Sequence, residues 1–199
     1  MVLLIMAACS GTGKSTLARR LLAEHPRLRL SVSHTTRPPR PGEQDGVDYH
    51  FTDAAGFRAL VAQDAFAEWA EYAGNAYGTS RAEIERARAA GQDLLFDVDV
   101  VGAAALKCRY PKSVSVFILP PSLDEVERRL RNRGTETEAS LAKRLAAARR
   151  ELDAAPTFDH LVLNADVESG YAELRTVYLA AGLRTSERSA LLDALRASV

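Results

Sequence analysis

The sequence is poor in the residues that build metal sites and disulfide frameworks. It has two cysteines, Cys9 and Cys108, and four histidines, and none of them forms a C-x-x-C pair or a metal-ligand spacing. This argues against a structural zinc site and against a small secreted fold held by disulfides. We expect the cysteines to be reduced and the protein to be cytoplasmic.

An excess of charge of one sign is also missing. Lys and Arg together number 26, as do Asp and Glu, so the formal net charge is zero. A dedicated binder of nucleic acid or anionic membranes normally carries a basic excess. We therefore expect neither partner, and any anion must be recognised locally. Only four of the 26 basic residues are lysines, so each lysine deserves inspection.

A charged leader is absent from the apolar run that opens the chain, and this run leads straight into Gly11, Gly13 and Lys14. It therefore predicts a buried strand and not a signal peptide. The length of 199 residues suits one compact domain, with 47% hydrophobic and 26% charged residues. We expect a single domain that works as a monomer.

Apolar runs alternate with helical periodicity, which is typical of an α/β fold with a parallel core sheet flanked by helices. Buried strands are predicted at Val2–Ala8, Leu94–Val98, Val114–Leu119 and Leu161–Leu163. Helices are predicted at Lys14–Glu24, Arg81–Ala90, Gly102–Tyr110, Leu123–Arg131, Ala139–Leu152 and Tyr171–Ala181.

Two regions break this rhythm. Residues 33–79 are loop-rich, and short alternating segments near Tyr49–Thr52 and Phe66–Tyr72 predict small antiparallel strands. Residues 124–151 are rich in charges of both signs and predict a helical hairpin hinged at Gly134. We interpret the first region as an insertion in the core.

A phosphate-binding loop is predicted between the first strand and the first helix, where residues 8–15 read A-C-S-G-T-G-K-S. Glycines let the backbone curl around phosphate oxygens, and the helix N-terminus adds partial positive charge. Lys14 would reach the outer phosphates and the Ser15 hydroxyl would ligate Mg²⁺. Many classes of nucleotide-using protein share such a loop, so it does not by itself name the reaction.

Two residues of this loop are unusual. Ala8 stands where such loops place their first glycine, and its Cβ is tolerated if φ is negative but costs about 1 kcal/mol or more if φ is positive. We expect phosphate binding to be retained. Cys9 lies near a helix N-terminus, so its thiol either has a lowered pKa and is oxidisable or is a small filler of the loop.

Two carboxylates close the apolar strand predicted at Leu94–Val98. Asp97 and Asp99 stand at alternate positions and so lie on one side of the strand. Folding alone does not explain a carboxylate at the end of a buried strand. We therefore predict that Asp97 serves the magnesium site together with Ser15, while the role of Asp99 stays open.

The stretch from Ser33 to Phe51 carries Arg37 and Arg40, three residues apart, in a proline-rich loop. Guanidinium groups match phosphate oxygens with paired hydrogen bonds, and prolines lower the cost of ordering the loop. An arginine pair alone is usually a solvated surface pair. The whole stretch, S-H-T-T-R-P-P-R-P-G-E-Q-D-G-V-D-Y-H-F, resembles the GMP-binding signature of the guanylate kinases.

This resemblance extends from Val2 to about Gly182. The other segments that carry it are Phe66–Trp69, Gly74–Thr79, Asp97–Asp99, Arg133–Glu138 and Lys143–Leu145. It implies the P-loop nucleoside-monophosphate kinase fold, an α/β fold with an inserted GMP-binding region and a helical lid. The implied parts are a core at 1–32, 80–123 and 152–183, a GMP-binding region at 33–79, a lid at 124–151 and a C-terminal extension at 184–199.

The resemblance also implies the roles of individual residues. On the ATP side these are Ser10, Gly11, Thr12, Gly13, Lys14, Ser15, Thr16 and Asn164. On the GMP side they are Ser33, Arg37, Arg40, Glu43, Tyr49, Glu68, Tyr77, Thr79 and Asp97. The catalytic cations are Lys14, Arg37, Arg40, Arg133 and Arg144, and the magnesium ligands are Ser15 and Asp97.

Guanine selectivity is predicted to rest on Glu43, with Ser33 and Thr79 at the same edge of the base. A carboxylate can accept from guanine N1–H and the 2-amino group together, and adenine offers no matching pair of donors. A site group left without its partner by the wrong base gives strong discrimination. Glu68 is expected nearby in the same pocket.

The implied reaction is ATP + GMP ⇌ ADP + GDP, with Mg²⁺ as the cofactor and dGMP as a further possible acceptor. The attacking phosphate oxygen is already ionised, so catalysis consists of positioning and charge neutralisation, completed by lid closure. Two alternatives stay open: a guanylate-kinase-like binding module and a kinase for a sugar phosphate. The retained cations disfavour the first, and the guanine-reading stretch disfavours the second.

Several positions depart from the family pattern. Val101 replaces a glutamine, and Ala165 interrupts an N-D-D run. In the extension, Leu191, Leu192 and Leu195 predict an added amphipathic helix that packs on the core or on a partner. Arg129, in the lid, is interpreted as a helix-surface charge.

Overall fold

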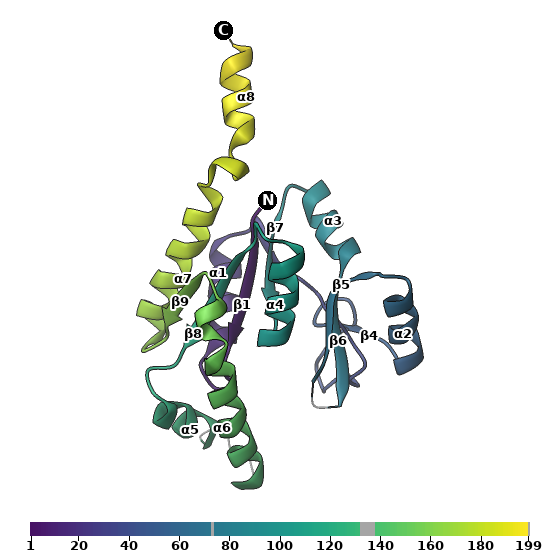
Figure 1. The fold of residues 1–199 in the computed structure, drawn as a ribbon, viewed down its shortest axis with the longest axis vertical. Helices are drawn as coiled ribbons and strands as arrows, with labels where there is room; N and C mark the ends of the chain where they lie inside the picture. The colour runs from purple at the N-terminus through teal and green to yellow at the C-terminus, as the bar shows by residue number, and fades with distance from the viewer. Residues whose placement is uncertain (73, 132–137, 199) are drawn as a thin grey trace.

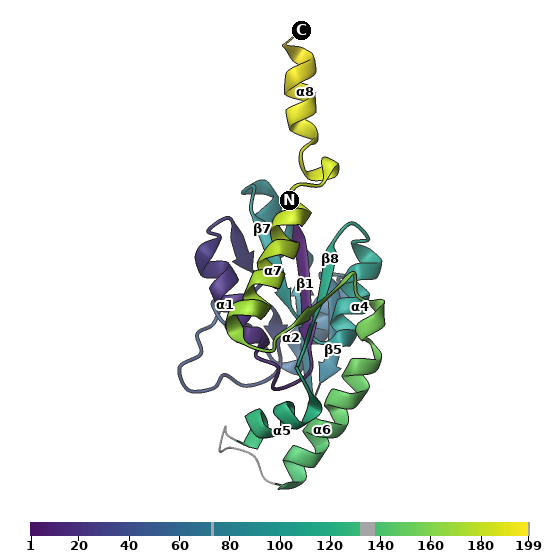
Figure 2. The same cartoon turned by 90° about the vertical axis from the view of Figure 1, so that its left-hand side faces the viewer.

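The computed structural model describes residues 1–199 except 73, 132–137 and 199. Its core is a parallel sheet with strand order β2-β7-β1-β8-β9. The strands are β1 (Leu3–Ala8), β2 (Leu28–Leu30), β7 (Asp93–Asp97), β8 (Val114–Leu119) and β9 (His160–Leu163). Helices cover both faces of this sheet (Figures 1 and 2), which confirms the predicted α/β fold.

Side chains of β1 alternate between the two faces because successive residues of a strand point to opposite sides. Leu4 and Met6 belong to the apolar cluster that includes α1 (Lys14–Glu24) and α7 (Val167–Gly182). Leu3 and Ile5 belong to the cluster on the other face, which includes α3 (Arg81–Ala89), α4 (Val100–Arg109) and α6 (Glu138–Asp153). The central strand is thus buried on both sides, as its unbroken apolar run predicts.

A second sheet, with strand order β4-β3-β6-β5, lies beside the core (Figure 1). Its elements are β3 (His34–Thr35), β4 (His50–Phe51), β5 (Phe66–Tyr72) and β6 (Asn75–Ser80), accompanied by α2 (Ala54–Ala62). The sequence did not predict β2, β3, β6 or α2. The strand β4 was expected to be antiparallel, but it pairs with β3 in parallel. Only Phe57 of α2 is buried.

The predicted helical hairpin consists of α5 (Leu123–Arg131) and α6, which pack through Val126, Leu130 and Leu141. Its expected hinge at Gly134 lies outside the described residues. Two short 3₁₀ turns, Ala155–Thr157 and Thr185–Glu187, complete the connections.

The C-terminal helix α8 (Ser189–Ala197) projects away from the core (Figures 1 and 2). The predicted helix is present, but its leucines 191, 192 and 195 are 57%, 45% and 66% exposed, so it does not pack on the core. Packing on a partner, the other alternative, stays a prediction. The preceding 3₁₀ turn is held by an ion pair between the Met1 amino group and Glu187, and the chain leaves the core from there. No helix among the described residues has the length and apolarity needed to cross a membrane.

Candidate active site

The predicted phosphate loop is formed between β1 and α1. Gly11 and Gly13 have φ of 87° and 89°, a conformation that favours glycine. No side chain caps the N-terminus of α1, so its first N–H groups remain available for an anion. Asp64 is the one non-glycine residue with positive φ in the described chain, so Ala8 is unstrained. The Ala8 Cβ is therefore tolerated in the loop, as expected for a residue whose φ is not positive.

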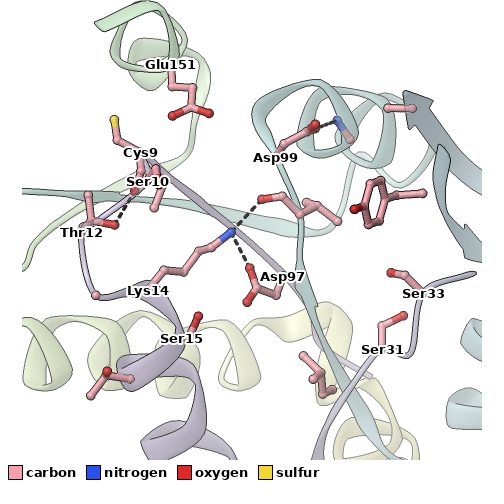
Figure 3. Close-up of a pocket in the computed structure, with 18 of the residues that line it drawn as sticks. Cys9, Ser10, Thr12, Lys14, Ser15, Ser31, Ser33, Asp97, Asp99 and Glu151 are labelled. Atoms are coloured by element: carbon pink, nitrogen blue, oxygen red, sulfur yellow. Dashed lines mark hydrogen bonds and ion pairs between the residues drawn. The ribbon is translucent and has the colours of Figure 1, made fainter. Parts of the chain in front are cut away.

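Lys14 extends from this loop toward the end of β7 (Figure 3). Its Nζ donates a hydrogen bond to the carbonyl oxygen of Val98 at 3.0 Å and forms an ion pair with Asp97. Asp99 is different, because its carboxylate accepts from the Gly102 N–H at 2.7 Å and caps α4. Asp97 therefore pairs with Lys14, while Asp99 caps α4, and both acids line the cavity at this strand end.

A cavity of about 500 Å³ connects the phosphate loop with the second sheet. The loop residues predicted to bind ATP, 10–16, all line it. From the predicted GMP side it is lined by Ser33, Tyr49, Glu68, Tyr77 and Asp97. Figure 3 shows Lys14 and Asp97 between the loop and Ser33.

Glu68 is the acid that the second sheet presents to this cavity. Its side chain is buried, and Oε1 accepts hydrogen bonds from the Thr79 backbone N–H at 3.1 Å and from the Thr79 hydroxyl at 2.7 Å. Burial raises the pKa of the Glu68 carboxyl, and the two bonds from Thr79 act against that shift. Thr79 thus positions Glu68 and does not itself line the cavity in the described structure.

Glu43 is placed differently from the prediction. Its Oε1 pairs with Arg37 Nη2 at 2.8 Å, and its Oε2 accepts from the Arg40 backbone N–H at 2.7 Å. The Arg37 guanidinium holds the pKa of the Glu43 carboxyl below its usual range. Both oxygens of Glu43 are therefore occupied, and Glu43, Arg37 and Arg40 are absent from the described cavity lining. The reading of a guanine edge by Glu43 stays a prediction.

Asn164, expected on the ATP side, contacts the phosphate loop itself. It is 3% exposed and its Nδ2 donates to the carbonyl oxygen of Thr12, so it supports the phosphate loop from beneath. Arg129 Nη1 donates to the same carbonyl oxygen at 3.1 Å. The interpretation of Arg129 as a surface charge is therefore wrong. In the sequence, Glu125 stands four residues before Arg129 and explains the arginine as an ordinary helix ion pair, so the contact with Thr12 could not be predicted.

The lid contributes Arg144, whose Nη1 donates to the Ser10 hydroxyl at 3.1 Å. Arg133, predicted to act beside it, lies outside the described residues. Glu151, which the sequence did not single out, also lines the cavity. Cys9 is buried, and burial raises the pKa of its thiol to about 12, so it is the inert filler of the two alternatives.

The oxygen donors at the mouth of the loop fit a magnesium ion. The Ser15 hydroxyl and the Asp97 carboxylate face the same cavity, and Mg²⁺ prefers such oxygens together with substrate phosphates and water. The described residues contain no group of three or more His, Cys, Asp or Glu side chains able to hold a metal by themselves. An ion here would therefore share its ligands with a bound nucleotide.

Comparisons with known proteins show which family the chain resembles. The family model described as guanylate kinase matches residues 1–181. The guanylate kinase of Oleidesulfovibrio alaskensis is 50% identical over 194 residues, which cover 98% of this chain and 94% of that protein. That of Neisseria gonorrhoeae is 46% identical, with 92% and 90% covered. The crystal structure of guanylate kinase from Anaplasma phagocytophilum matches with a TM-score of 0.76 and 31% identity, with 92% and 87% covered. The chain belongs to the guanylate kinase family.

Proposed function

We propose that this protein transfers the γ-phosphate of ATP to GMP or dGMP, giving ADP and the corresponding diphosphate. The observation that carries the proposal is the single cavity of about 500 Å³ that joins the phosphate loop to Glu68 and the tyrosines of the second sheet. A donor and an acceptor nucleotide that meet in one cavity can react directly. Membership of the guanylate kinase family supports the identity of both substrates.

On the donor side, the phosphates lie in the loop of residues 10–16. The uncapped N-terminus of α1 supplies N–H groups and partial positive charge. Lys14, which pairs with Asp97 in this structure, supplies a full charge at the outer phosphates. Asn164 and Arg129 hold the Thr12 carbonyl and so keep the loop in shape.

On the acceptor side, we assign recognition of guanine to Glu68. Its carboxylate lines the cavity, and both of its hydrogen bonds in the described structure go to Oε1, so Oε2 is available to a base. Guanine N1–H and the 2-amino group can both donate to such a carboxylate. Glu43 then orients Arg37 and the backbone of Arg40, and these arginines bind the GMP phosphate with Tyr49 and Tyr77.

The chemistry needs no general base, because the attacking phosphate oxygen is already ionised. The protein must bring two anions into line and offset their charge. Lys14, Arg37, Arg40, Arg144 and Arg133 supply positive charge for this purpose. Mg²⁺, held by Ser15, Asp97 and the phosphates, would neutralise further charge on the transferred group.

Coupled measurement of ADP release with GMP, dGMP, AMP and UMP tests this function. We expect turnover that depends on Mg²⁺ and that is fastest with GMP or dGMP. Absence of turnover together with intact GMP binding would reject the kinase and favour a binding module. Equal rates with AMP would reject the recognition of guanine by Glu68.

We propose that a monomer is the working unit, because residues assigned to the ATP side and residues assigned to the GMP side line the same cavity within the chain. Cys9 and Cys108 are both free thiols, and Cys108 is exposed. An exposed free thiol suits a reducing compartment, so we propose that the reaction takes place in the cytoplasm. Sedimentation equilibrium of the full chain tests the monomer.

A further inference from the structure

Ser31 is a buried residue of the nucleotide cavity that the sequence did not single out. It follows β2 directly, and its N–H donates to the Leu95 carbonyl oxygen at 2.9 Å, so the chain is still hydrogen-bonded to β7 at this point. The residue is 7% exposed and lines the cavity. In Figure 3 its side chain lies near that of Ser33, on the side of Asp97 that faces away from Lys14. Ser31 therefore belongs to the acceptor side of the cavity.

The hydroxyl of Ser31 is the polar group that needs an explanation. Its Oγ is buried and has no hydrogen-bond partner among the described residues. Burying a hydroxyl without a partner costs about 1–3 kcal/mol of folding free energy. Two other buried hydroxyls at this site avoid that cost, because Thr12 donates to the Cys9 carbonyl oxygen at 2.8 Å and Thr79 donates to Glu68 at 2.7 Å. A buried hydroxyl that lines a cavity and lacks a protein partner points to a partner in the ligand.

The chemistry of the acceptor side indicates which ligand atom suits this hydroxyl. The Glu68 carboxylate accepts hydrogen bonds, so it serves the N1–H and 2-amino donors of guanine. Guanine also presents O6, which is an acceptor and stands next to N1–H on the base. A buried O6 needs a donor, and the Thr79 hydroxyl is already bonded to Glu68. The hydroxyl of Ser31 is a donor that no described residue uses.

We propose that the Ser31 hydroxyl donates a hydrogen bond to O6 of the acceptor guanine and so contributes to the affinity for GMP. Glu68 accepts from the two donors of the base, and Ser31 donates to its acceptor. O6 has two lone pairs, so Ser33, predicted at the same edge, can share it. A hydroxyl can also turn and accept from the 6-amino group of adenine, so Ser31 adds affinity for the base and leaves the rejection of adenine to Glu68.

The inference rests on the proposed function for the identity of the acceptor base, and calorimetry tests the two separately. Titration with GMP measures binding without ATP and without turnover. A parent chain that binds GMP and does not phosphorylate it would reject the kinase and leave the role of Ser31 standing. A parent chain that does not bind GMP would reject both. Phosphorylation of GMP together with an unchanged GMP affinity in Ser31→Ala would reject the role of Ser31 alone.

The test compares Ser31→Ala with the matched control Ser113→Ala. Ser113 is also buried, at 3% exposed, and its Oγ likewise has no hydrogen-bond partner among the described residues, but it is not part of the described cavity lining. We expect Ser31→Ala to raise the Kd and KM for GMP about tenfold, as for the loss of one hydrogen bond, with the Kd for ATP unchanged. Ser113→Ala should bind both nucleotides as the parent chain does.

Two base analogues locate the contact on the guanine. IMP keeps O6 and lacks the 2-amino group, whereas the monophosphate of 2-aminopurine riboside keeps the 2-amino group and lacks O6. Ser31→Ala should weaken the binding of IMP about tenfold, as for GMP, and leave the binding of the 2-aminopurine nucleotide unchanged. A merely structural role of Ser31 would weaken the binding of both analogues alike.

Three results would overturn the proposal: an unchanged GMP affinity in Ser31→Ala, an equal loss of affinity for the two analogues, and an equal loss of ATP affinity. The thermal unfolding midpoints of Ser31→Ala and Ser113→Ala should match or exceed that of the parent chain, because each variant loses an unpaired buried hydroxyl. If Ser31→Ala does not fold, Ser31→Cys decides, since a thiol of similar size is a weaker donor. A GMP affinity of Ser31→Cys equal to that of the parent chain would contradict the contact.

Discussion

The donor and acceptor halves of the cavity are built in different ways. The phosphate loop stands between a fully buried strand and a helix, and it is supported by residues far away in the sequence, including Asn164. The acceptor half rests on the second sheet, where β5 and β6 carry Glu68 and Tyr77 and where β3 and β4 have only two residues each. Its main charged contact, Arg37 with Glu43, joins residues six positions apart. The donor half is therefore held by the core, and the acceptor half largely by local polar contacts.

The two halves also differ in how far they are preorganised for their nucleotides. All of residues 10–16 already line the cavity, whereas Arg37 and Arg40 are not part of its described lining. Glu43 and Arg37 satisfy each other in the structure. We expect the acceptor half to rearrange when the GMP phosphate competes for Arg37, and the donor half to change little.

The largest effect should follow from removing the charge of the donor half. Lys14→Met should lower kcat by about 10³-fold or more, because one preorganised charge on the transferred phosphate is lost. Binding of GMP should remain close to that of the parent chain. Steady-state kinetics and titration calorimetry measure the two effects. Lys112→Met, at an exposed lysine, is the control, and a Lys14 variant with full activity would contradict the donor role.

The next effect separates the two acids of the acceptor half. Glu68→Gln should lower kcat/KM for GMP by about 10²-fold, because a buried hydrogen bond to a charged group is replaced by a poorer one. Glu43→Gln should raise the KM for GMP less and leave the preference for GMP over AMP intact. Kinetics with both nucleotides measure this preference. Loss of base preference in the Glu43 variant would restore the role first predicted for that residue.

The pH dependence of GMP binding should single out the same acid. Since burial raises the pKa of the Glu68 carboxyl, its proton returns at a higher pH than for an ordinary glutamate. GMP affinity should therefore fall on acidification earlier than an exposed carboxylate would allow. The sign for stability is opposite, since the raised pKa favours the fold at low pH and this contribution is lost as pH rises through it. In Glu68→Gln, the early fall of GMP affinity and the low-pH contribution to stability should both be absent. If the variant shows the same pH profiles as the parent chain, Glu68 is not the acid that binds guanine.

A smaller effect is expected from the supports of the phosphate loop. Asn164→Ala removes a buried donor to the Thr12 carbonyl and should cost about 1–3 kcal/mol of folding free energy and weaken ATP binding. Arg129→Ala should weaken ATP binding less. Arg128→Ala is the control, since Arg128 pairs with Glu125 as Arg129 does but makes no contact with the loop. Urea unfolding and ATP titration measure both quantities, and equal behaviour of the two arginine variants would reject the support role of Arg129.

The smallest effect should come from removing residues 189–199. Helix α8 buries none of its described residues, so truncation after Arg188 should change the unfolding midpoint and the kinetics little. A large loss of stability on truncation, or a change in the number of chains per particle in sedimentation, would show that α8 packs against the core or against another copy of this chain.

Much of the core could be predicted because its signals are local. The unbroken apolar run of β1 and the eleven residues of α1 were predicted within a residue of their bounds. The strand β2 was not, since it has only three residues, of which one is buried. Helix α8 has a clear apolar stripe, yet no property of that stripe tells whether the core offers it a place to pack.

In the candidate site, too, the features with local sequence signals could be predicted, and those that depend on tertiary contacts could not. The glycines and the lysine of the phosphate loop depend on neighbouring residues, so the sequence alone was sufficient for them. Glu68 is part of the described cavity lining, whereas Glu43 pairs with Arg37 and is not part of that lining. Two carboxylates look alike in a sequence and differ only once their surroundings are folded.

The sequence by itself therefore determined the class of fold, the phosphate loop and the family to which the chain belongs, because each rests on spacing within a short stretch. The tertiary structure decided the buried position of Glu68 and the support of Thr12 by Asn164 and Arg129. These depend on residues brought together from distant parts of the chain, and burial and hydrogen bonding there fix what each side chain can do.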